Sequence, residues 1–174
     1  MSRTVLTSLA AAACLVAAAP PPATATDVVY EQQEVAAAGT GERLTLDVPD
    51  NWERSRLNRH SVGFFDYTAP GRWIVVDLEP LVDTVREART ERREMRALGP
   101  RYYREHEFRV SGPGAAVRVR WVYSYRDAQT DDTWSWTSVY LVGDNRLVVD
   151  GRRSQRAALE PISRHVVGSV ESAG

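Results

Sequence analysis

The stretch LDVPDNW, residues 46–52, decides how this chain is read, because an alternating apolar run ends there in a proline turn and a tryptophan follows. Residues 43–48 alternate as a strand with one buried face does, and Pro49 ends the strand because proline cannot donate to a ladder. The turn directs Trp52 back over the sheet edge, where burial of an indole stabilises a fold. We therefore expect Trp52 to be a core residue; the alternative is an exposed binding residue.

Six further segments have the composition of β-strands and are separated by turn residues such as Pro70-Gly71. Several of them alternate apolar and polar residues, which is typical of antiparallel strands with one solvated face. The predicted strands are residues 61–69, 72–80, 102–110, 115–125, 133–142 and 146–152.

Two segments have helical spacing instead. In the first, a capping box at Thr84 and Glu87 precedes a stop at Gly99-Pro100. Its apolar stripe is Leu81, Val85, Ala88, Met95 and Leu98. The second helix is expected from about Glu160 to the end of the chain, with Pro161 in its first turn and a stripe at Leu159, Ile162, Val166 and Val170. This order predicts an α+β fold, an antiparallel sheet flanked by helices, in one domain at 43–174 after a leader at 26–42 that contains at most one short strand.

The first 25 residues have the pattern of an export signal. Arg3 is followed by an alanine-rich apolar run, and Ala23-Thr24-Ala25 matches a small-residue cleavage site, so we expect the mature chain to start near Thr26. Cys14 is the only cysteine and lies within this signal. An ordinary signal-peptide cysteine is the favoured interpretation, and a lipidated Cys14 is the alternative. The predicted location is secreted or extracytoplasmic, with membrane attachment only if Cys14 is lipidated.

Charge and motifs argue against several functions. The formal net charge is −1, which disfavours nucleic-acid binding. The chain has no nucleophile elbow, phosphate-binding loop or dinucleotide fingerprint, and His60, His106 and His165 are not at metal-ligand spacing. We expect no cofactor and no enzymatic activity.

Two clusters keep chemical alternatives open. Glu105 and Glu107 alternate on a strand beside His106, so we expect the two carboxylates to share a face; a solvated strand face is favoured, and a hydrolase is the alternative. An acidic loop offers hard oxygen ligands for calcium, although a merely solubilising loop is favoured. Its residues are Asp127, Asp131 and Asp132.

Two patches are candidate binding surfaces. Four arginines share one face of the predicted helix, and three glutamates form a separate acidic stripe. The arginines could present a basic ridge to an anionic glycan or lipid headgroup. The favoured alternative is that their aliphatic stems cover the apolar stripe of the helix. The four arginines are Arg86, Arg89, Arg93 and Arg96, and the acidic stripe is Glu87, Glu91 and Glu94.

In the last hairpin, we expect aromatic side chains to gather on one face of the sheet. They form either an exposed stacking patch or, as we favour, part of the core. These are Trp134 and Trp136, with Trp121, Tyr123 and Tyr125 opposite them.

The order of elements and several short motifs resemble the PsbP/LpqN-like family. The motifs are VPDNW at 48–52, GAAVRVRWVYSY at 114–125 and ISRHVVGSVES at 162–172, and the resemblance covers most of residues 43–172. It implies an α/β/α sandwich and is strongest to the secreted or lipid-anchored actinobacterial branch.

Relatives in this family act as non-catalytic partners, and none of their binding residues matches a position here. We therefore predict an exported, monomeric, non-catalytic domain that binds a protein or an envelope component. A lipoprotein accessory of envelope assembly or secretion is one alternative, and a hydrolase is the other.

Overall fold

The computed structural model describes residues 28–37, 43–69, 71–78, 84–99, 101–113, 117–126, 134–142 and 145–173. The predicted signal with Cys14 and the acidic loop with Asp127, Asp131 and Asp132 lie outside these residues.

Seven antiparallel strands form the main sheet, in the order β3-β4-β5-β9-β8-β7-β6. Six of these strands were predicted from alternation and turn residues, and β3 was missed because its four residues are all exposed and show no apolar pattern. The strands are β3 Glu53–Arg56, β4 Ser61–Asp66, β5 Arg72–Asp77, β6 Tyr103–Ser111, β7 Arg118–Arg126, β8 Trp134–Val142 and β9 Asn145–Arg152.

A second sheet of three strands, ordered β1-β2-β10, makes the prediction of a single sheet wrong. It consists of β1 Tyr30–Ala36, β2 Arg43–Pro49 and β10 Glu171–Ala173. Strand β1 falls inside the predicted leader and pairs with β2 along its whole length, while β10 pairs with the other edge of β2. The two ends of the described chain therefore meet on β2, a pairing that local sequence does not specify.

Two helices accompany the sheets, α1 Thr84–Ala97 and α2 Arg156–Gly168. Helix α2 begins four residues before the predicted start, directly after the 3₁₀ turn η3 Arg153–Gln155, so Pro161 lies inside the helix rather than in its first turn. A proline there removes one helical hydrogen bond. Burial of the stripe at Leu159, Ile162 and Val166 stabilises the helix despite this loss.

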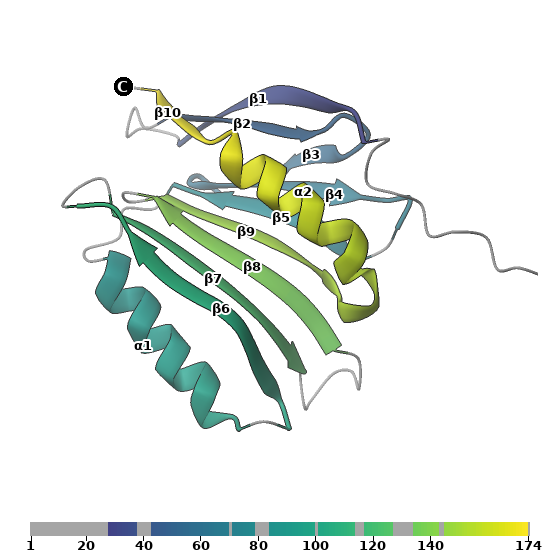
Figure 1. Ribbon diagram of the computed structural model, residues 1–174. Helices are drawn as coiled ribbons and strands as arrows, with labels where there is room; N and C mark the ends of the chain where they lie inside the picture. Colours follow the sequence, from purple (N-terminus) through teal and green to yellow (C-terminus); the bar gives the residue numbers. More distant parts are fainter. Residues whose placement is uncertain are drawn as a thin grey trace, which may run out of the picture.

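The two faces of the main sheet are packed differently. Figure 1 shows α2 crossing the middle of the main sheet, with the three-stranded sheet beside it, whereas α1 lies against β6 at the far end. The larger apolar cluster joins both sheets to α2 and includes Trp52, which is 6% exposed, so the prediction of a core tryptophan is confirmed. A smaller cluster, with Ala88 from α1 and Trp121 from β7, lies on the opposite face.

Candidate functional site

Helix α1 carries a groove lined by arginines, which we call the α1 groove. Arg89, Arg92, Arg93 and Arg96 line this concavity of about 290 Å³. Three of the four predicted arginines thus meet, because positions three and four apart lie on one helix face. Arg86, the fourth, lies instead at a neighbouring cavity of about 340 Å³ with Arg146 and the acidic stripe of Glu87, Glu91 and Glu94.

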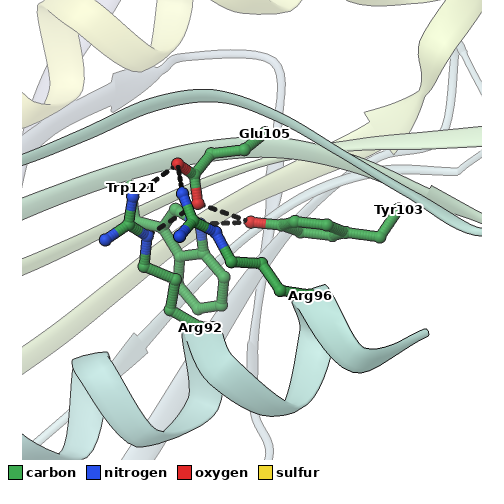
Figure 2. Close-up of polar contacts among 5 residues, drawn as sticks. All are labelled: Arg92, Arg96, Tyr103, Glu105 and Trp121. Carbon is green, nitrogen blue, oxygen red and sulfur yellow. Dashed lines mark hydrogen bonds and ion pairs between the residues drawn. The ribbon is translucent and has the colours of Figure 1, made fainter. Parts of the chain in front are cut away.

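Glu105 of β6 anchors two arginines of the groove (Figure 2). The Nε and Nη2 of Arg92 donate to the two oxygens of Glu105 at 2.7 and 2.6 Å, and Nη2 of Arg96 donates to Oε1 at 2.7 Å. Tyr103 donates its hydroxyl to Oε2 at 2.9 Å and accepts a bond from the indole Nε1 of Trp121 at 3.0 Å. The carboxylate therefore accepts four bonds from three side chains.

The electrostatics of this network follow from its bonds. Hydrogen bonds from Arg92, with smaller contributions from Arg96 and Tyr103, lower the pKa of Glu105 to about 2 although partial burial opposes them. Burial is the main reason that the pKa of Tyr103 rises to about 12. At neutral pH the network is therefore a carboxylate held by two guanidinium groups and a neutral phenol.

The remaining arginines leave the groove positively charged. Arg89 and Arg93 are exposed and make no ion pair or hydrogen bond among the described residues. Arg92 also stacks 4.0 Å from the ring centroid of Phe108, which fixes the plane of its guanidinium. The groove thus holds two unpaired cations beside two arginines that share one carboxylate.

Sequence reasoning missed Arg92 and Glu105 as members of this site. Arg92 lies three residues from Arg89, so helical spacing already pointed to it. Glu105 had no such signal, because its position against α1 depends on how β6 pairs with β7.

A β-bulge separates the groups of the hydrolase alternative. Glu105 lies opposite Tyr123, and Glu107 lies opposite the adjacent residue Val122, so the expectation that the two carboxylates share a face is wrong. The extra residue of a bulge shifts the alternation by one position. Glu107 instead pairs with Arg120 at 3.2 Å, and the three acid-base groups do not converge.

His106, the extra residue in this bulge, contacts the buried hydroxyl of Ser124 at 2.9 Å. Burial first, and the nearby arginines Arg156, Arg153 and Arg104 after it, lower the pKa of His106. Because Ser124 is fully buried, this pair presents no nucleophile to solvent.

The predicted aromatic patch is divided between the two faces of the sheet. Trp121 lies opposite Val139, and Trp136 lies opposite Ser124, so the two tryptophans point to opposite sides and the expectation of one shared patch is wrong. A register offset of one residue reverses every side chain of a strand. Trp121, Tyr123 and Trp136 are buried, which agrees with the prediction that these aromatic residues belong to the core. Trp134 is only half-buried.

The histidines and acidic residues form no metal centre within the part of the chain that the structure describes. His165 stacks on Tyr30 with ring centroids 3.8 Å apart, and its Nε2 lies 3.1 Å from the carboxylate of Asp47. This imidazole is packed between α2 and the small sheet. Neither α1 nor α2 has the length and apolar composition that a membrane crossing requires.

No protein-family model matches the chain, and no curated protein matches it by sequence. Solved structures do match. PsbP from Synechocystis sp. PCC 6803 (CyanoP) has a TM-score of 0.53 at 12% identity, covering 90% of this chain and 98% of that one. The fold is PsbP-like.

Two other structures share this PsbP-like fold. The Ran-binding protein Mog1p of Saccharomyces cerevisiae has a TM-score of 0.53 at 12% identity, covering 83% of this chain and 96% of that one. LpqN, involved in cell envelope biogenesis of Mycobacterium tuberculosis, has a TM-score of 0.53 at 14% identity, covering 89% of this chain and 100% of that one. At these identities the likeness concerns the fold alone.

Proposed function

We propose that this protein is an exported, non-catalytic binding domain whose α1 groove binds an anionic glycan of the cell envelope. The single observation that carries the proposal is the groove itself, in which Arg89 and Arg93 are exposed, with no partner among the described residues, beside Arg92 and Arg96. Guanidinium groups bind carboxylates and phosphates through paired N–H donors, so such a groove favours a ligand with repeated negative charges.

The Glu105 network supports binding because it holds the groove in shape before a ligand arrives. Ordering a long side chain at an interface costs roughly 0.5–1.5 kcal/mol, and Arg92 is already ordered by Glu105 and Phe108. Since the pKa of Glu105 is about 2, its charge and the shape of the groove stay constant across physiological pH.

The biological setting of the proposal rests on two supports. The predicted signal at residues 1–25 favours export, and LpqN, which has the same fold, is involved in cell envelope biogenesis. The proposal includes membership of the secreted or lipid-anchored actinobacterial branch of the PsbP/LpqN-like family. Mog1p has the same fold and is a Ran-binding protein, which supports a protein as the alternative binding partner of this domain.

Titration with an oligogalacturonate by calorimetry tests the groove. Wild-type protein binds this carboxylated probe, and Arg89→Gln/Arg93→Gln weakens binding by about tenfold or more because two charge-assisted contacts are lost. The single variants Arg89→Gln and Arg93→Gln are compared with Arg86→Gln, which removes the same single charge from the same helix but lies outside the α1 groove. Equal binding by the double variant and the wild type contradicts the proposal.

A lipoprotein accessory of envelope assembly or secretion is the second candidate, and Cys14 is the observation that favours it. Intact mass spectrometry of the protein from its own source distinguishes the two candidates. A mass that begins near Thr26 indicates a secreted domain, and a diacylated mass that begins at Cys14 indicates a lipoprotein.

A further inference from the structure

We propose a second anion site, formed by Trp134, Arg104 and Arg153, that takes a phosphate group. Three separate elements meet there, since Trp134 begins β8, Arg104 lies on β6 and Arg153 begins η3. The Cζ atoms of Arg104 and Arg153 lie 5.0 and 5.5 Å from the ring centroid of Trp134. Both guanidinium groups thus lie within cation–π distance of one half-buried indole.

The two arginines have no carboxylate partner among the described residues. The nearby acids are already engaged, because Glu160 binds Arg156 and Arg164, and Glu107 binds Arg120. The segment 127–133 lies outside the described residues. Two guanidinium groups that have no carboxylate partner in the described part of the chain favour binding of an anion.

The surrounding charge points the same way. The pKa of His106 is lowered first by burial and then by Arg156, Arg153 and Arg104, while Glu160 opposes them, so the positive charge of these arginines acts on a group beside the site. At neutral pH the imidazole is uncharged, and the arginines carry the attraction.

This site is distinct from the α1 groove. Successive residues of a strand point to opposite faces, so Arg104 and Glu105 project to different sides of β6. Glu105 binds Arg92 and Arg96 on the α1 side, whereas Trp134 shares its face with Trp136, which packs in the cluster under α2. The two sites can therefore be disabled independently.

Phosphate suits the site better than a carboxylate because of its charge and its number of oxygens. A tetrahedral phosphate has three or four oxygens and carries more negative charge than a single carboxylate, so it offers more acceptors to two guanidinium groups. Attraction to the ring of Trp134 restricts the movement of both guanidinium groups.

Titration of the full chain with inorganic phosphate at constant ionic strength tests the proposal, with the indole N–H of Trp134 followed by NMR and assigned through Trp134→Phe. We expect a saturable shift that sodium acetate does not reproduce. Arg104→Gln and Arg153→Gln each weaken phosphate binding by about tenfold. Arg109→Gln, an exposed arginine of the same strand, leaves it unchanged. No saturable shift, or equal weakening by Arg109→Gln, overturns the proposal.

Two further probes identify the source of the phosphate. Glycerol 3-phosphate represents a soluble ester, and vesicles containing phosphatidylglycerol represent a lipid headgroup. Binding of either probe that Arg153→Gln weakens supports the site and assigns the source, and failure of both probes together with inorganic phosphate overturns it. Arg153→Gln leaves oligogalacturonate binding at the α1 groove intact, so failure of one proposal is distinguishable from failure of the other.

Discussion

The two faces of the main sheet are stabilised by different means. Under α2 and the small sheet, a large cluster of buried apolar residues joins both sheets to the helix, from Leu46 on β2 to Val166 on α2. Under α1, a few apolar and aromatic side chains are joined by a network of Arg92, Arg96 and Glu105. The comparison teaches that the apolar face holds the fold together, whereas the α1 face combines modest packing with charges that position a binding groove.

The largest effect is expected on the α2 face. Trp136→Ala removes a side chain that is 0% exposed and leaves a cavity, so we expect a loss of roughly 3–5 kcal/mol in the free energy of unfolding. Urea denaturation measures this loss. Val110→Ala, which removes a side chain that is 37% exposed on β6, is the control and changes stability little. A loss below about 1 kcal/mol for Trp136→Ala would show that this face is not the main support.

Glu105→Gln tests the charged anchor of the other face. It leaves the partly buried guanidinium of Arg92 and the exposed guanidinium of Arg96 without their shared carboxylate, and we expect a loss of about 1–3 kcal/mol, mainly from Arg92. Glu107→Gln, across the bulge, breaks a more exposed pair with Arg120 and should cost about 0–1 kcal/mol. Equal losses in the two variants would contradict the anchoring role of Glu105.

The pH dependence of that anchor has a defined direction. The folded pKa of Glu105 is lowered to about 2 from 4.5, so its contribution is present above pH 4.5 and is lost as the pH falls towards 2. The stability difference between wild type and Glu105→Gln, measured by urea denaturation at several pH values, should therefore shrink below pH 4. A constant difference would contradict this linkage.

Asp150, on the same face of the sheet as Glu105, responds to pH in the opposite direction. Burial raises its pKa to about 6 from 3.8, while the bond from Thr137 opposes the rise, so the folded state disfavours the ionised carboxylate. Stability is lost as the pH rises from about 4 through 6. We expect Asp150→Asn to stabilise the protein by about 1–2 kcal/mol at pH 7.5 and by little at pH 4, as measured by thermal unfolding. Destabilisation at pH 7.5 would show that the ionised form is needed.

The smallest effect on stability is expected in the α1 groove. Arg89→Gln/Arg93→Gln removes two exposed cations without partners among the described residues, so the free energy of unfolding should change by no more than about 0.5 kcal/mol. Urea denaturation beside the oligogalacturonate titration separates binding from folding. A large loss of stability would mean that these arginines hold α1 in place.

Local patterns predicted much of this molecule. Alternation at residues 43–48 and in the last hairpin identified β2, β7 and β8, and helical spacing identified α1 and the stripe of α2. Helical spacing also brought Arg89, Arg93 and Arg96 together on one face, because three- and four-residue periodicity is a property of the helix alone. Trp52 was predicted as core because a proline turn determines where the next side chain points.

What the sequence by itself determined is therefore the order of both helices and of the strands other than β3 and β10, the apolar stripe at Leu159, Ile162 and Val166 of α2, and the arginine face of α1. Leu98 of the predicted α1 stripe is instead 51% exposed beyond the end of that helix. Only the tertiary structure decided that β1, β2 and β10 form a separate sheet, that a bulge at His106 divides Glu105 from Glu107, and that Trp134 meets Arg104 and Arg153. The physical reason is that periodicity depends on neighbours along the chain, whereas register, bulges and strand partners depend on residues distant in sequence.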